Sequence, residues 1–125
     1  ILADLVSQLS QLRELRLEIE TQFSDKHIER LAINLPSLEK LHTGGHGLTD
    51  QALMSLSTLN YLKRVSVEGS RFTFKALMAY ILSLGPMNNG MSMTIVLMHD
   101  DALTRKESRA LREALHDAVN GHMSL

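Results

Sequence analysis

The sequence predicts an α/β solenoid of repeated strand–helix units, with about four parallel strands and the helices on the opposite, convex side. Two recurring patterns carry this prediction. An apolar spacing recurs as Leu12-x-x-Leu15-x-Leu17, Leu38-x-x-Leu41, Leu62-x-x-Val65-x-Val67 and Ile95-x-Leu97. An apolar residue followed by a hydroxyl residue recurs as Phe23-Ser24, Leu48-Thr49, Phe72-Thr73 and Leu103-Thr104. Such self-similarity is typical of repeat architectures, because each unit is too small to bury its own hydrophobic face.

The apolar–hydroxyl pairs set the register of the repeats. Serine and threonine are preferred helix N-caps, so each pair marks the start of a helix. The first three pairs are 25 and 24 residues apart, and the last two are 31 apart. The excess falls in Gly85–Gly90, a turn-rich insertion between a helix and the next strand. Units of this length suit helix crossovers between parallel strands.

The predicted elements follow this register. The expected strands are Glu14–Ile19, Leu38–Thr43, Leu62–Val67 and a fourth around Ile95–Leu97. The expected helices are Asp25–Asn34, Asp50–Thr58, one ending near Leu84 and one ending near Asn120. Ile1–Leu9 has apolar residues at helical spacing and is expected to be the helix of a repeat whose strand lies upstream. The last helix is expected to pack on its neighbour, because its apolar stripe is not bulky enough to favour a membrane surface.

Length and composition indicate one domain, residues 1–125, of ordinary globular character. Of its 125 residues, 44% are hydrophobic and 22% charged, and the net charge is -1. That balance favours neither nucleic acid, nor a membrane surface, nor an acidic substrate. The chain has no cysteine, which removes disulfides and thiolate chemistry. The chain begins at Ile1 without a methionine, and we interpret it as the C-terminal fragment of a longer solenoid.

The repeats resemble a known family. The pattern LxxLxL, followed by the segment LTDQALMSL at Leu48–Leu56, resembles leucine-rich repeats of the helix-bearing kind. The stretch from Leu38 to Leu53 is most similar to the repeats of F-box adaptor proteins, and ribonuclease-inhibitor-like proteins have related repeats. The resemblance covers about Leu9 to Leu115. The chain departs from the F-box type in having no cysteine, and Thr43 stands where an aliphatic residue is usual.

The resemblance implies a protein-interaction module that binds through the concave face of its sheet. The residues that alternate with the strand leucines would form that face: Glu14, Arg16, Glu18, Lys40, His42, Gly44, Arg64, Ser66, Glu68, Thr94, Val96 and Met98. Arg16, Lys40, His42 and Arg64 are the expected contacts, since arginine is enriched at interface hot spots. The competing interpretation is that these charges form only a solvated sheet face. Glu14 and Lys40 are expected to be lateral neighbours, worth ~0.2–1 kcal/mol as a pair.

Val96 and Met98 would place two apolar residues at the end of that face. We expect the loop Gly85–Ser92 to cover them; the alternative is that they seat a side chain of a partner. Four rungs of sheet offer about 250 Å², against the ~800 Å² per partner of a standard interface. Missing upstream repeats or loops are therefore expected to supply the rest of the surface.

Metal binding, cofactors and catalysis are not expected. His42 and His46 lie in a glycine-rich turn, and adjacent residues such as His99, Asp100 and Asp101 cannot all converge on one ion. No phosphate-binding loop and no Gly-x-Ser-x-Gly elbow is present. An enzyme would need an activity that depends on His42 or His99.

The sequence interpretation is therefore a protein-interaction module, with a protein partner and neither nucleic acid nor membrane. The preferred version, implied by the resemblance, is the substrate-recognition part of an F-box ubiquitin-ligase adaptor, intracellular and either cytoplasmic or nuclear. It would reach the ligase scaffold only through an F-box upstream of Ile1. The alternative is a non-adaptor scaffold or regulator that binds a folded protein directly.

Overall fold

The computed structural model describes residues 11–16, 24–44, 48–97 and 103–125. They form an α/β fold around one five-stranded, all-parallel sheet with the strand order β1-β2-β3-β4-β5. The strands are β1 Glu14–Arg16, β2 Lys40–Gly44, β3 Arg64–Ser70, β4 Ser92–Leu97 and β5 His122–Ser124. The helices are α2 Asp25–Asn34, α3 Asp50–Leu56, α4 Phe74–Leu82 and α5 Arg105–Val119, with a short 3₁₀ turn η1 at Pro86–Asn88.

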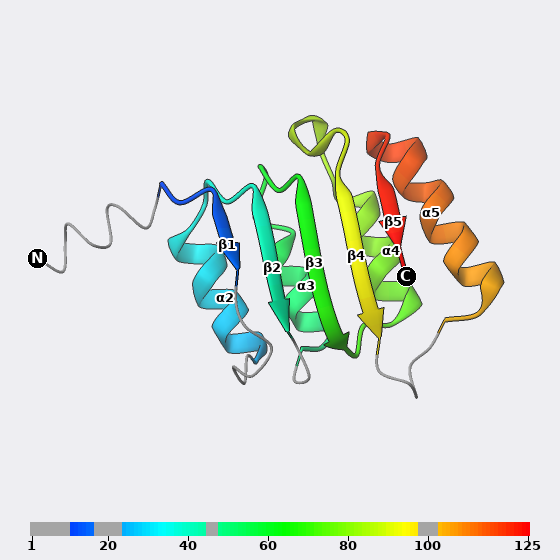
Figure 1. Ribbon diagram of the computed structural model, residues 1–125, viewed down its shortest axis with the longest axis horizontal. Helices are drawn as coiled ribbons and strands as arrows, with labels where there is room; N and C mark the ends of the chain where they lie inside the picture. Colours follow the sequence, from blue (N-terminus) through cyan, green and yellow to red (C-terminus); the bar gives the residue numbers. More distant parts are fainter. Residues whose placement is uncertain (1–10, 17–23, 45–47, 98–102) are drawn as a thin grey trace, which may run out of the picture.

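Each strand pairs with the next strand in the chain, and one α-helix lies in each connection. Crossovers between parallel strands are right-handed almost without exception. Because all four advance along the sheet in the same direction, they place their helices on the same face. Figure 1 shows this arrangement, with α2, α3 and α4 behind the strands and α5 next to β5. The other face of the sheet is not covered by a described helix.

Alternation along the strands decides which side chains enter the core. In β3, Val65 and Val67 are buried, whereas Arg64 is exposed and Ser66 is half-buried. Leu41 in β2 and Ile95 in β4 are likewise fully enclosed, because successive side chains of a strand point to opposite faces. The core is the layer between the sheet and the helices. The helices contribute buried residues such as Ile28, Leu53, Leu77 and Leu111.

The predicted helix starts are confirmed. In α3, α4 and α5 the hydroxyl of Thr49, Thr73 or Thr104 accepts a hydrogen bond from a backbone N–H of the first turn. Glu107 completes a capping box in α5, where its Oε1 accepts from the Thr104 N–H at 3.0 Å. Three helices end slightly earlier than expected, at Leu56, Leu82 and Val119. Because helix ends fray, the last residue of a helix is difficult to predict from the sequence.

The helix starts are also tied to one another by a ladder of aspartate–threonine contacts. Asp25 of α2 accepts hydrogen bonds from the N–H and hydroxyl of Thr49, at 2.8 and 2.6 Å. Asp50 of α3 accepts the same pair from Thr73, at 2.9 Å each. Phe74 takes the equivalent place in α4 and offers no carboxylate, so the ladder ends there. Each aspartate thus stabilises its own helix N-terminus and joins it to the start of the next helix.

The insertion Gly85–Gly90 is a turn, as expected, and Asn88 is its anchor. The Asn88 side chain is buried, and its Nδ2 donates to the carbonyl oxygens of Asn60 and Leu62 at 3.1 and 2.8 Å. Its Oδ1 accepts from the Gly85 N–H at 2.9 Å. One side chain therefore fixes the connection α4–β4 against the connection α3–β3.

The sequence predicts about four strands and does not predict β5. This strand follows α5 after Asn120, a residue in the left-handed conformation (φ 54°), and Gly121. Gly121 is needed at this point, because a Cβ there would lie 2.5 Å from the Met91 carbonyl oxygen and 2.9 Å from Leu115 Cγ. Met123 then points into the core, as Met93 does beside it in β4. Three residues are too few to show a periodicity.

Two other expected elements lie partly or wholly outside the described residues. The expected strand Glu14–Ile19 is described only as far as Arg16, and the expected helix Ile1–Leu9 lies outside the described residues. Of the described helices, none combines the length and the apolar character that crossing a membrane requires.

Candidate partner-binding surface

The uncovered face of the sheet carries most of the residues predicted to bind a partner, and we call it the open face. Its first row runs across all five strands as Glu14, Lys40, Arg64, Ser92 and His122. The second row, two residues further along each strand, is Arg16, His42, Ser66, Thr94 and Ser124. The third described row is Gly44, Glu68 and Val96. The lateral order predicted for Glu14, Lys40 and Arg64 is therefore confirmed. The fourth strand is shifted by two residues from the predicted alignment, because Ser92 lies beside Arg64 and Thr94 lies beside Ser66. The role of these residues as contacts stays a prediction.

The predicted face residues are not equally accessible. Arg16, Lys40 and Arg64 are exposed, and His42 and Ser66 are half-buried. Gly44 is buried and offers no surface. Glu18 and Met98, both predicted contacts, lie outside the described residues.

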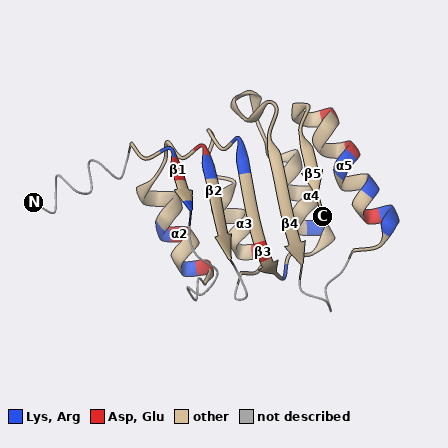
Figure 2. Cartoon of the chain, viewed as in Figure 1, with Lys and Arg blue, Asp and Glu red and all other residues tan. Residues whose placement is uncertain are grey.

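Three cations gather at the β1–β3 end of the open face, and we call Arg16, Lys40 and Arg64 the basic cluster. Together with Glu14, His42 and Ser66 they line a shallow depression of about 70 Å³. None of the three forms an ion pair with another described residue. Figure 2 shows basic residues where β2 and β3 begin and where β1 ends.

The expected ion pair between Glu14 and Lys40 is not formed, although the two are in register. Glu39, the residue before Lys40, instead forms an ion pair with Arg13, whose Nε lies 3.6 Å from Glu39 Oε2. Arg13 is well exposed, so solvent screens this pair and it contributes little to stability.

The expectation that the loop Gly85–Ser92 covers Val96 is wrong. That loop precedes β4 and lies at the end of the sheet where β4 begins, whereas Val96 is near the end where β4 stops (Figure 1). Val96 is accordingly 48% exposed. A short connection cannot fold back along the whole length of the strand that follows it. A single exposed apolar residue of this kind is common on protein surfaces.

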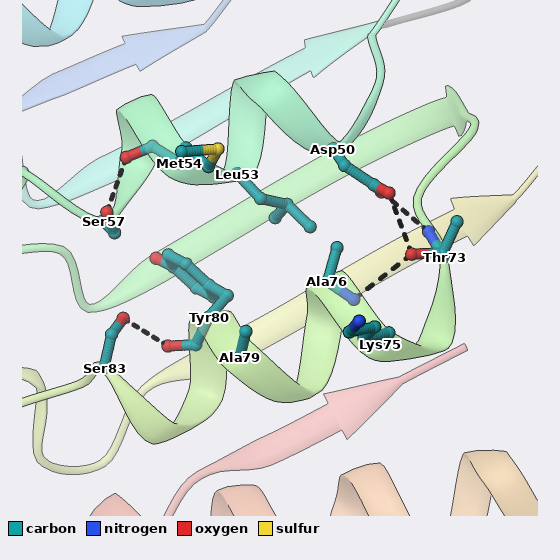
Figure 3. A pocket seen from close by; sticks show the side chains of 10 residues that line it. All are labelled: Asp50, Leu53, Met54, Ser57, Thr73, Lys75, Ala76, Ala79, Tyr80 and Ser83. Atoms are coloured by element: carbon teal, nitrogen blue, oxygen red, sulfur yellow. Dashed lines mark hydrogen bonds between the residues drawn. The ribbon is translucent and has the colours of Figure 1, made fainter.

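A second hollow, absent from the sequence predictions, lies between α3 and α4. It has a volume of about 350 Å³ and is lined along its length by Leu53 and Met54 of α3 and by Ala76 and Ala79 of α4. Figure 3 shows the Asp50–Thr73 contact at one end of this groove, and Ser57 and Ser83 at the other. Small side chains at Ala76 and Ala79, one helical turn apart, leave the space open. That spacing was the available signal in the sequence.

Tyr80 lines this groove with a buried hydroxyl group. Its side chain is buried, and its hydroxyl makes no hydrogen bond to another described residue. Burial raises the pKa of Tyr80 far above its ordinary value, because the phenolate would be poorly solvated there. Ser83 does not compensate, since its hydroxyl donates instead to the Tyr80 backbone carbonyl at 2.6 Å.

Metal-ligating residues do not converge in the described part of the chain, where no group of three or more His, Asp and Glu side chains could hold an ion. His42 lies in the second row of the open face beside Arg16 and Ser66. The other histidines and aspartates considered from the sequence, His46 and His99–Asp101, are outside the described residues.

Comparison of the chain with protein-family models, with curated proteins and with solved structures found no match.

Proposed function

We propose that this chain is a protein-interaction module that binds its partner on the open face of the sheet. The observation that carries the proposal is the basic cluster, three exposed cations on an uncovered sheet face with no ion pair to another described residue. The helices cover one face of the sheet and leave the other to present rows of polar side chains from several strands. Rigid strands hold such side chains at fixed lateral spacing, which favours specific recognition.

The finer version of the proposal is a leucine-rich-repeat solenoid. The regular helix caps, one parallel strand for each unit and the ladder from Asp25 to Thr73 support it. Within that version, the substrate-recognition part of an F-box ubiquitin-ligase adaptor remains the preferred function. A scaffold or regulator that binds a folded protein directly is the alternative. Co-purification of the full-length gene product with a ligase scaffold subunit is expected for the adaptor, and its absence would favour the alternative.

The described open face is smaller than a complete interface. Five strands at ~4.8 Å and three rows of side chains give about 300 Å², against ~800 Å² per partner for a standard complex. The partner therefore also contacts surface beyond these three rows.

A site-specific photocrosslinker tests the location of the interface. Placed at Ser66, in the middle of the open face, it is expected to give a discrete protein adduct in extracts of the source cell. Excess protein without the crosslinker should compete this adduct away. The same crosslinker at Ser108, a half-buried serine of α5, is the matched control. Equal labelling from Ser66 and Ser108, or no competable adduct from Ser66, would contradict the proposal.

A further inference from the structure

The charge of the open face differs from the charge of the whole chain. The complete sequence has a net charge of -1, which by itself favours no acidic ligand. In the first two rows of β1, β2 and β3, however, three cations stand with one carboxylate, Glu14. The third row adds Glu68, so the described rows of the open face carry one positive charge in excess. An average over 125 residues conceals this local excess.

The fold gains nothing from placing Lys40 and Arg64 together. They are directly paired in register on adjacent strands, and like charges in this position destabilise a sheet. The carboxylate that precedes Lys40 in the chain, Glu39, is engaged by Arg13 instead. A bound anion would relieve the repulsion between Lys40 and Arg64.

The depression between the cations limits the size of the anionic group. Its volume of about 70 Å³ is room for roughly two water molecules, which suits a single carboxylate. His42 and Ser66 line the same depression and add hydrogen-bond donors to those of the cations. Arg64 can hold a carboxylate with two parallel hydrogen bonds, a geometry that lysine cannot provide.

We propose that the partner segment bound by the open face is an acidic peptide, with an Asp or Glu carboxylate seated in the depression between the cations of the basic cluster. This inference rests on the proposed function and adds the chemistry of the partner. Because the cations are exposed, the attraction is screened by salt, and the affinity falls as ionic strength rises.

Three fluorescent peptides of identical length test the inference against the intact chain by fluorescence anisotropy. The first carries Asp and Glu, the second carries Asn and Gln at the same positions, and the third carries phosphoserine at those positions. We expect the Asp/Glu peptide to bind in a salt-dependent manner and the amide peptide not to bind. Equal affinity for the acidic and amide peptides would overturn the inference. Binding of the phosphoserine peptide alone would overturn its carboxylate assignment.

Charge variants localise the binding. Lys40→Glu and Arg64→Glu should each raise Kd by at least about tenfold, since 1.4 kcal/mol of lost attraction is a factor of ten. Lys106→Glu makes the same change on the exposed surface of α5 and should leave Kd unchanged. Lys40→Ala provides a milder change should a reversal disturb folding, which circular dichroism would reveal. An equal loss in Lys106→Glu would show attraction to total charge and refute the site.

The outcomes separate the two proposals. A competable adduct from Ser66 together with no acidic-peptide binding would leave the open face as an interface and refute its acidic ligand. The absence of both would refute the proposed function as well.

Discussion

Tyr80 shows how a single polar atom can oppose the packing around it. Its ring is buried between α3 and α4, which is favourable, whereas its hydroxyl has no hydrogen-bond partner among the described residues. A buried donor left unpaired costs about 1–3 kcal/mol of desolvation. The unpaired hydroxyl of Tyr80 therefore lowers the free energy of unfolding, although the packing of its ring raises it.

Tyr80→Phe should stabilise the protein at neutral pH, by up to about 1–3 kcal/mol, because the ring is retained and the unpaired hydroxyl is removed. Urea denaturation followed by circular dichroism measures the free energy of unfolding. Tyr61→Phe is the matched control, since Tyr61 is 46% exposed and should give no change. Destabilisation by Tyr80→Phe would mean that the hydroxyl has a partner.

The same residue predicts a pH dependence. Burial raises the pKa of Tyr80 in the folded state, while the unfolded residue titrates near 10. Above about pH 10 the unfolded state holds fewer protons than the folded state, so the free energy of unfolding falls as pH rises. The difference between the Tyr80→Phe variant and the natural protein should widen above this pH. A constant difference would contradict the assignment.

Asn88 is a second residue whose contribution to stability depends on partners that are distant in the chain. Asn88→Ala would leave the carbonyls of Asn60 and Leu62 and the Gly85 N–H without their partner. We expect a loss of at least about 1–3 kcal/mol, the cost of one such group left unsatisfied. Asn89→Ala, at an exposed neighbour, is the control in the same denaturation experiment. Similar losses in both variants would show that the turn itself, and not the Asn88 side chain, is responsible.

At the scale of elements, the successive strand–helix units are alike where each helix starts. Three helices are capped by a threonine and two carry an aspartate directly after the cap residue. Local residues decide these starts, because a cap contacts only the first turn of its own helix. The aspartates add a link to the neighbouring repeat.

The strand β5 depends instead on a close approach of two backbones. The N–H of His122 donates to the Met91 carbonyl at 2.9 Å, and Gly121 passes beside Leu115 without a Cβ. Gly121→Ala should detach β5 from β4 and lower the free energy of unfolding by about 1–3 kcal/mol, the usual cost of overpacking. Amide hydrogen exchange at His122 should accelerate in the variant.

Gly85→Ala is the control for that experiment. A Cβ at Gly85 meets no atom within 4 Å, and its φ of -115° is ordinary for alanine. This variant should be as stable as the natural protein. Unchanged exchange at His122 in Gly121→Ala would show that the chain relaxes around the new methyl group.

At the scale of the whole molecule, one continuous core lies beneath the sheet and one charged surface lies above it. Leu41 and Lys40 are adjacent in β2 and belong to these two environments. Leu41→Asp places a carboxylate in the core and should unfold the described fold, because an unpaired buried charge costs several kcal/mol. Lys40→Glu should retain the fold and its melting transition. Equal circular dichroism melts for the two variants would contradict the inward and outward assignment.

The sequence predicted the parts of the fold that depend on local pattern. Alternation along Val65–Val67 indicated a strand with one buried face, and the pairs ending in Ser24, Thr49, Thr73 and Thr104 indicated four helix starts. It also predicted the lateral order of Glu14, Lys40 and Arg64, because equivalent positions of successive repeats become neighbours. The prediction that a loop covers Val96 was wrong, because the exposure of Val96 depends on where that loop lies in the folded protein.

What only the tertiary structure decided are the contacts between groups that are distant in the chain. The three residues of β5 carry too little periodicity to be recognised, and they pair only because Gly121 lets two backbones meet. The groove at Tyr80 depends on the separation of two helices, and the unpaired state of the basic cluster depends on side-chain distances. By itself, the sequence determined a parallel α/β architecture, because local signals for a strand and for a capped helix recur along the chain. The free surface charge was decided by packing, because the distance from each cation to the nearest carboxylate exists only in the folded chain.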